Sequence, residues 1–279
     1  MSHTFKQSIC NEVYQDWQFH DACKSIRSIG YTGIEIAPFT LAETPASITT
    51  AERKQYRGII SSEGLRFVGL HWLMVSPKGL HVTTPDKALR EKSWQHVRDL
   101  IDLCADLGDA GVMVVGSPKQ RSSTDGSTVA EATKRFEEMF ATLSSQAMER
   151  HVTLLVEALP ADQSDVVNTL AAAVEIVKNV GSPAVRTMFD SHNGADETEP
   201  HSVLVDRYFD YIRHVHVNEM DGRHPGTGDY DFKPVFEVLK RRGFGGWVSL
   251  EAFDFTPGAE TIARESLQHI ESEIAKLTQ

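Results

Sequence analysis

Eight short runs rich in β-branched and apolar residues alternate with segments of helical periodicity along the whole chain. Runs of this kind are typical of buried strands, and strict alternation with helices favours parallel pairing through right-handed crossovers. The sequence therefore predicts a parallel sheet covered by helices. The predicted strands are residues 6–10, 33–37, 66–73, 111–116, 153–158, 185–190, 212–218 and 247–252.

Helical spacing is clearest in residues 87–107, where Leu89, Trp94, Val97 and Leu100 recur on one face. Apolar residues at this spacing predict a helix that packs one side against the sheet. The same pattern predicts helices over residues 128–150, 168–180, 234–242 and 256–276.

The number of repeated units favours one closed barrel, an α/β fold of the (β/α)₈ type. No G-x-G-x-x-G follows an early strand, which removes the usual support for an open dinucleotide-binding sheet. The 279 residues match the length of about 250 that such a barrel needs. We therefore expect residues 1–279 to form a single domain.

Charge and cysteine content narrow the possible partners. A formal net charge of -11 argues against nucleic acid, because phosphate backbones require a basic surface. Cys10, Cys23 and Cys104 form no C-x-x-C pair, which favours reduced thiols in a cytoplasmic protein. The start, MSHTFKQSICNE, lacks the apolar segment of a secretory signal, and no run approaches 18 apolar residues. We expect a soluble cytoplasmic protein with no membrane partner.

Four consecutive predicted strands carry a metal-binding type of residue at or near their ends: Glu157, Asp190, His216 and Glu251. The spacings are 33, 26 and 35 residues (157 to 190, 190 to 216, 216 to 251), roughly one barrel unit each. Because barrel active sites form at the carboxyl ends of the strands, these side chains should converge on one point.

A metal ion is the simplest explanation for this convergence. A single strand-end carboxylate often only caps a helix or forms an internal salt bridge, but three unpaired carboxylates in one apolar mouth would repel each other. Three oxygens and one imidazole nitrogen suit Mn²⁺, Mg²⁺ or Co²⁺ better than Zn²⁺. We expect one divalent ion, with Mn²⁺ as the first choice.

Short motifs around these residues resemble a known family. They are GIEIA at 33–37, VEALP at Glu157, FDSHN at Asp190, HVHVNE at His216, R-x-P-G at Arg223 and SLEAF at Glu251. Over nearly its whole length the chain is similar to the xylose-isomerase-like TIM-barrel sugar isomerases and epimerases. That group includes D-tagatose and D-psicose 3-epimerases and 2-keto-myo-inositol isomerases.

The resemblance implies a metal-dependent isomerase or epimerase of a keto sugar or related polyol ketone. In such an enzyme a divalent ion would bind the carbonyl and a neighbouring hydroxyl of the ketose and would stabilise an enediolate. Glu157 and Glu251 are the expected catalytic acid and base, on opposite faces of the sugar carbon. One removes a proton and the other returns one.

Further residues are expected to bind the substrate. Arg223 matches the arginine that contacts substrate oxygens in the family, with a loop ion pair to Asp221 or Asp229 as the alternative. His192 and Asn193 stand two and three residues after Asp190, where the ketohexose epimerases have their histidine at three.

Gln163 departs from the same pattern, because those epimerases carry a glutamate six residues after the first ligand. An amide keeps hydrogen bonding but loses proton transfer. A modified keto sugar, a ketoglycoside or a ketoinositol is then as plausible a substrate as a free ketose.

Several candidates have two readings. His71 and Trp72 follow the third strand and either stack on a sugar or pack in the core. Lys119 and Arg121 follow the fourth strand and either reach the substrate or lie in a solvated loop.

Strand 212–218 places His214, His216 and Asn218 on one face, so His214 is expected as an internal partner rather than a fifth ligand. Glu35 either hydrogen-bonds within the site or anchors a neighbouring loop.

Three other functions are compatible in principle with a barrel that carries these residues. The main one is a lyase, either a dehydratase or an enzyme that cleaves 3-keto-glycosides through the same enediolate, with His192 as the acid. A DNA-cleaving phosphodiesterase would need more metal ligands and a basic face, and an inactive sugar-binding barrel would not need four intact ligands. The expected partner is a small carbohydrate, and a homo-oligomer is left open.

Overall fold

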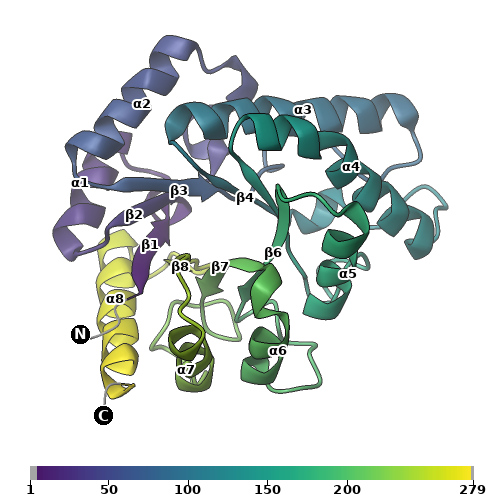
Figure 1. Cartoon of the computed structure of the whole chain (residues 1–279). Helices are drawn as coiled ribbons and strands as arrows, with labels where there is room; N and C mark the ends of the chain where they lie inside the picture. Colours follow the sequence, from purple (N-terminus) through teal and green to yellow (C-terminus); the bar gives the residue numbers. More distant parts are fainter. Residues whose placement is uncertain (1–4, 278–279) are drawn as a thin grey trace.

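Parallel strands form a closed barrel in the structure, a computed structural model that describes residues 5–277. The strands follow one another around the barrel in chain order, and β1 closes it by pairing with β8 (Figure 1). Their bounds are β1 Lys6–Cys10, β2 Gly33–Ile36, β3 Arg66–Leu70, β4 Val112–Val115, β5 Thr153–Val156, β6 Val185–Asp190, β7 Ile212–Val217 and β8 Trp247–Leu250.

Helices surround the barrel on the outside, as Figure 1 shows. They are α1 Phe19–Ile29, α2 Thr50–Ser62, α3 Lys87–Leu107, α4 Val129–Glu149, α5 Leu170–Val180, α6 His201–Tyr208, α7 Lys233–Arg241 and α8 Ala259–Lys276. The predicted (β/α)₈ fold is confirmed. The helix over residues 87–107 has the predicted bounds, whereas β3 ends earlier than predicted because Trp72 adopts a left-handed backbone conformation (φ 49°).

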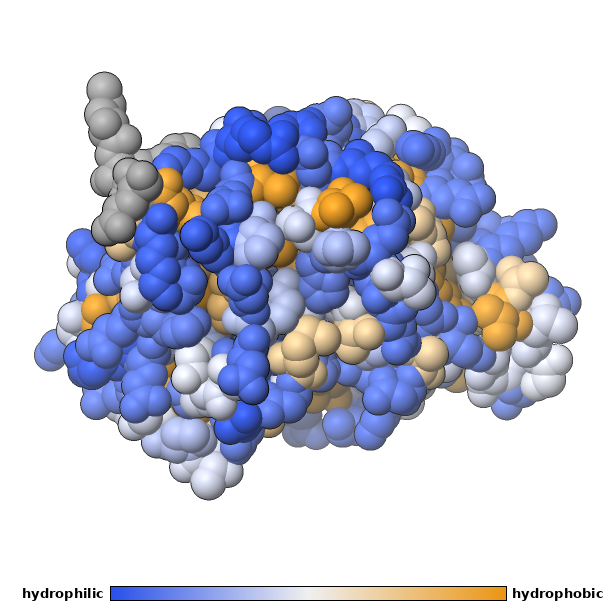
Figure 2. Space-filling view, turned by 90° about the horizontal axis from the view of Figure 1, so that it is seen from below, coloured by the Kyte–Doolittle hydropathy of each residue, from blue (hydrophilic) through white to orange (hydrophobic). Residues whose placement is uncertain are grey.

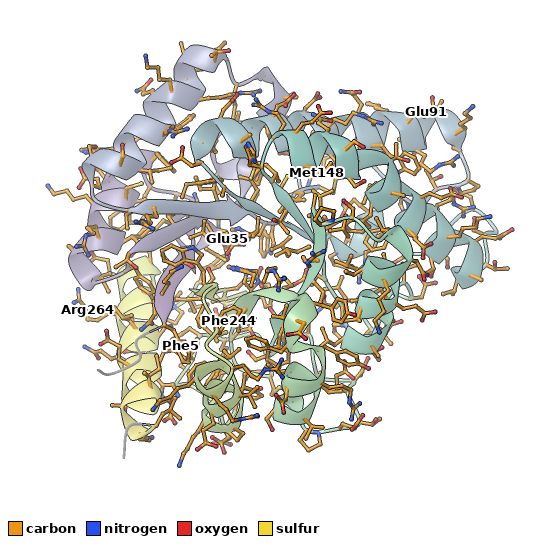
Figure 3. The ribbon with its side chains drawn as sticks, viewed as in Figure 1. Phe5, Glu35, Glu91, Met148, Phe244 and Arg264 are labelled. Carbon is orange, nitrogen blue, oxygen red and sulfur yellow. The ribbon has the colours of Figure 1, made fainter. Side chains whose placement is uncertain are left out.

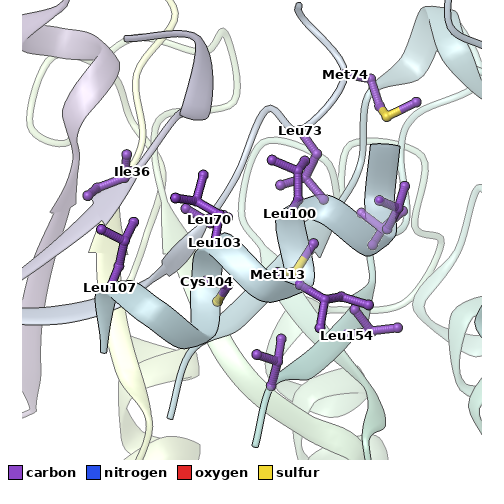
Figure 4. Close-up of a cluster of buried hydrophobic side chains, with 14 of the residues drawn as sticks. Ile36, Leu70, Leu73, Met74, Leu100, Leu103, Cys104, Leu107, Met113 and Leu154 are labelled. Carbon is purple, nitrogen blue, oxygen red and sulfur yellow. The ribbon is translucent and has the colours of Figure 1, made fainter. Parts of the chain in front are cut away.

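The main core lies between the barrel and the helices. Leu100, Leu103 and Leu107 of α3 are buried there in one cluster with Leu70 of β3 and Met113 of β4 (Figure 4). This is the apolar face that the helical periodicity predicted, and its burial excludes water from the outer side of the strands.

Helix starts are fixed by side-chain caps at several positions. Thr49 and Glu52 form a capping box at α2, and Thr128 and Glu131 form another at α4. Asp86 accepts hydrogen bonds from two backbone amides at the start of α3. These caps set where the helices begin and hence how each loop leaves its strand.

The surface is largely hydrophilic on the face drawn in Figure 2, where hydrophobic side chains are scattered among polar ones. Among residues 5–277, no helix combines the length and the apolar character needed to cross a membrane. Cys10, Cys23 and Cys104 are free and buried.

Candidate metal centre

The carboxyl ends of four neighbouring strands bring Glu157, Asp190, His216 and Glu251 together. One ligand atom from each of the four lies within 4.8 Å of those of the others, and all four residues are buried. Asp190 ends β6 directly opposite His216 on β7, while Glu157 and Glu251 come immediately after β5 and β8. The convergence expected from the strand spacing is therefore present in the fold.

Neighbouring side chains hold the carboxylates in place. Asn193 donates from Nδ2 to Oε1 of Glu157 at 3.1 Å, and its backbone amide donates to Oδ1 of Asp190 at 2.8 Å. Trp72 donates from Nε1 to Oε1 of Glu251 at 2.9 Å. These bonds use one oxygen of each carboxylate and orient the side chains. The second oxygens of Glu251 and Asp190 also have partners, because Oε2 of Glu251 lies 3.0 Å from Nδ1 of His216 and Oδ2 of Asp190 accepts from Nδ2 of Asn218 at 3.3 Å.

Burial and the closeness of the carboxylates shift the pKa values of the acidic residues in the centre. Burial, together with the charges of Glu251 and Asp190, raises the pKa of Glu157 to about 8. Burial also raises the pKa of Glu251. Burial opposes ionisation of Asp190 too, but the neighbouring His216 ring holds the pKa of Asp190 below its usual value.

The donor set fits a divalent cation. Three carboxylates and one imidazole within 4.8 Å supply hard oxygen ligands and one nitrogen, the combination suited to Mn²⁺, Mg²⁺ or Co²⁺. Burial and the neighbouring carboxylates both raise the pKa of Glu157, and a cation at this point would offset the repulsion among the carboxylates. The residues present therefore form a group that could hold a divalent metal ion.

A cavity of about 400 Å³ opens above the centre, and Glu157 and Glu251 both line it. Such a volume lies within the range of about 300–1,000 Å³ found for small-molecule sites. Other wall residues include four that were expected to bind substrate: Trp72, Lys119, Gln163 and Asn193.

His192 is joined to this wall through Gln163. The Nε2 atoms of Gln163 and His192 lie 3.1 Å apart, and Nδ1 of His192 lies 2.7 Å from the carbonyl oxygen of Met220. A carbonyl only accepts, so Nδ1 carries a proton. In the neutral ring, Nε2 therefore accepts a hydrogen bond from the amide of Gln163.

Other expected substrate contacts lie away from the cavity. His71 is fully buried, with Nε2 2.5 Å from Oε2 of Glu12, which corresponds to the core reading of this residue. Arg223 is 44% exposed and donates from Nε to Oδ2 of Asp221 at 2.7 Å, the loop ion pair weighed as its alternative.

Both predictions for Arg121, a substrate contact or a solvated loop residue, are wrong. It is fully buried, so it is neither a solvated loop residue nor a group that reaches into the cavity. Its guanidinium donates to the carbonyl oxygens of Val115, Glu157 and Val167. This side chain joins the ends of β4 and β5 to the loop that carries Gln163.

Two cavity residues had no signal in the strand pattern. Phe253 stacks on Trp72, with ring centroids 6.0 Å apart and planes 6° apart, and Lys78 lies in the wall as well. Phe253 is the last residue of the SLEAF motif, two residues after Glu251, so the motif was the available signal for it.

Comparison with known proteins gives a family and a fold. A model of the protein family described as "Xylose isomerase-like TIM barrel" matches residues 23–273. The "Probable ketose 3-epimerase" of Synechocystis sp. is 25% identical to the chain over 91% of its length and 83% of the relative's. The L-ribulose 3-epimerase of Mesorhizobium japonicum is 22% identical over 66% of the chain and 62% of the relative.

Solved structures agree on the architecture. The crystal structure of 3-keto-D-glucoside 4-epimerase from E. coli superposes with a TM-score of 0.83 and 18% sequence identity. The match covers 96% of this chain and 100% of that one. At this identity the likeness establishes the fold alone.

Proposed function

The chain belongs to the xylose isomerase-like TIM barrel family, and we propose that it is a divalent-metal-dependent isomerase or epimerase of a keto sugar or a related polyol ketone. The observation that carries this proposal is the convergence of three carboxylates and one imidazole beside a cavity that Glu157 and Glu251 line. Relatives named as ketose and ribulose 3-epimerases support the same class of reaction.

One divalent cation, with Mn²⁺ as the first choice, would be held by Glu157, Asp190, His216 and Glu251. When bound, it would polarise the substrate carbonyl and make the neighbouring C–H group more acidic. The proposal assigns the remaining chemistry to side chains of this chain.

Glu157 and Glu251 are the proposed acid and base. Both line the cavity, and each has one oxygen held by a neighbour, Asn193 for Glu157 and Trp72 for Glu251. A Cβ atom at Gly116 would lie 2.0 Å from Oε2 of Glu157, so this glycine leaves room for that oxygen. One glutamate removes a proton from the sugar carbon and the other returns one, which inverts the centre or moves the carbonyl.

The remaining wall would bind the sugar hydroxyls. Gln163, Asn193 and Lys119 offer amide and ammonium groups, and the stacked rings of Trp72 and Phe253 add aromatic surface to the cavity wall. Arg223 is proposed to contact substrate after leaving Asp221, because its present ion pair is exposed and such pairs are weak.

Fewer observations bear on the domain organisation, the partners and the cellular compartment of the protein. We propose that residues 1–279 act as one domain on a small carbohydrate, without nucleic acid. Three free, buried cysteines fit a reducing compartment, which supports the cytoplasm as the site of action.

A lyase built on the same centre is the second candidate. Loss of a substituent would require an acid that protonates the leaving group, and His192 is the residue expected to supply it. Because Nδ1 of His192 faces the carbonyl of Met220, the neutral ring has only an acceptor at Nε2. We therefore rank isomerisation or epimerisation first.

The test uses the Mn²⁺-loaded protein with free ketoses, 3-ketoglycosides and a ketoinositol in D₂O, followed by NMR. We expect deuterium at one carbon of a single product isomer and no lost substituent. A released substituent would support the lyase, and no exchange with any member of the panel would contradict both. A protein with Glu157→Gln and Glu251→Gln together is the control for exchange that does not need the two carboxylates.

A further inference from the structure

A buried carboxylate lies behind the proposed metal centre. We infer that Glu35 is a positioning residue, which fixes the ring of His216 so that Nδ1 faces the cation site. Figure 3 shows Glu35 among the strands of the barrel, whereas Met148 and Arg264 lie on outer helices. This inference rests on the proposed metal site, and the experiment below separates the two.

His216 has two distinct partners for its two ring nitrogens. Nδ1 lies 3.0 Å from Oε2 of Glu251 and 3.6 Å from Oδ2 of Asp190, on the side of the proposed cation. Nε2 lies 3.2 Å from both carboxylate oxygens of Glu35. A carboxylate that accepts from Nε2–H leaves the lone pair on Nδ1, which is the form of imidazole that binds a metal.

Glu35 is itself held firmly. It is fully buried, and Oε2 lies 2.8 Å from Nε2 of His214, the neighbouring polar residue on the same face of β7. The pairing of β2 with β3 shifts register between Ile34 and Glu35. Irregularities of this kind often re-aim a side chain next to an active site. Because His214 contacts Glu35 and not the proposed cation, it would influence His216 only by holding the Glu35 carboxylate in place. This agrees with its expected role as an internal partner.

The same barrel contains a matched control. Glu12 is a second fully buried carboxylate beside an imidazole, with Oε2 2.5 Å from Nε2 of His71. Glu12 and His71 lie outside the four proposed ligands and form a separate group with Cys10. Glu12→Gln thus makes the same chemical change as Glu35→Gln, but at a carboxylate that contacts His71 and not His216.

The experiment measures the dissociation constant of Mn²⁺ by calorimetry in wild type, Glu35→Gln and Glu12→Gln. Loss of an outer partner of a metal-bound histidine typically weakens metal binding by about 10–100-fold. We expect a weakening in this range for Glu35→Gln and less than about 3-fold for Glu12→Gln. Thermal unfolding with a chelator checks that each variant folds, and Glu35→Ala replaces Glu35→Gln if the latter does not.

A second readout follows the proton itself. With Mg²⁺ bound, wild type and Glu12→Gln should show a slowly exchanging Nε2–H resonance of His216, assigned by its loss in His216→Gln. Glu35→Ala should lose that resonance. Unchanged Mn²⁺ affinity in Glu35→Gln, or an equal loss in Glu12→Gln, would overturn the inference. Absence of Mn²⁺ binding to wild type would instead overturn the proposed function.

Discussion

Single residues at the strand ends carry most of what the sequence reveals about the site. Glu157, Asp190, His216 and Glu251 were found because strand length and spacing alone determine which residue reaches the carboxyl end of each strand. The role of Arg121 was not found, because two of the three carbonyl groups that its guanidinium binds belong to Glu157 and Val167, 36 and 46 residues away in the chain. Such tertiary contacts leave no mark in local periodicity.

Replacement of Glu157 or Glu251 by glutamine tests the acid and base roles. Each change removes proton transfer but keeps the size of the side chain, so kcat should fall by at least about 100-fold while the barrel still folds. Steady-state kinetics with the substrate found by the D₂O screen measures this. Glu91→Gln, an exposed change on α3, is the control, and near-normal turnover in either site variant would refute the two-carboxylate scheme.

Arg223→Ala tests substrate binding by the loop after β7. If the arginine binds the ground state and the transition state alike, KM should rise and kcat should change little. Asp221→Asn removes the ion-pair partner seen in the structure and should leave KM unchanged or lower it. Equal KM values in wild type and Arg223→Ala would exclude a substrate contact.

At the scale of elements, the prediction succeeded where one periodicity fills the whole segment. The helix over 87–107 alternates apolar and polar faces from end to end, so its limits could be read directly. The irregularities of the strands could not be predicted from the sequence. The early end of β3 at Leu70, two residues before the left-handed Trp72, and the register shift at Glu35 depend on neighbouring strands, and both change which side chains face the centre.

The clamp formed by Arg121 between β4, β5 and the following loop gives a prediction at this scale. Arg121→Met should lower the free energy of unfolding by at least about 3 kcal/mol, because three carbonyl groups lose their donor in a buried setting. Urea unfolding measures the change. Lys119→Met, an exposed neighbour, should stay within about 0.5 kcal/mol of wild type, and equal stability of the two variants would contradict the clamp.

For the whole molecule, a metal that binds only the folded barrel must stabilise it. Mn²⁺ at one hundred times its dissociation constant should add about 2.7 kcal/mol to the free energy of unfolding. A chelator should reverse this gain. Asp190→Ala should lose most of it, whereas Asp162→Asn, an exposed carboxylate on the loop after β5, should keep it. A gain independent of Asp190 would place the stabilising ion elsewhere.

Diffraction from Mn²⁺-soaked crystals at the manganese absorption edge tests the shared cation most directly. The account predicts one strong anomalous peak per chain at the carboxyl ends of β5 to β8, bonded to Glu157, Asp190, Nδ1 of His216 and Glu251. A map without a peak there, or with the four side chains turned away from one another, would contradict it.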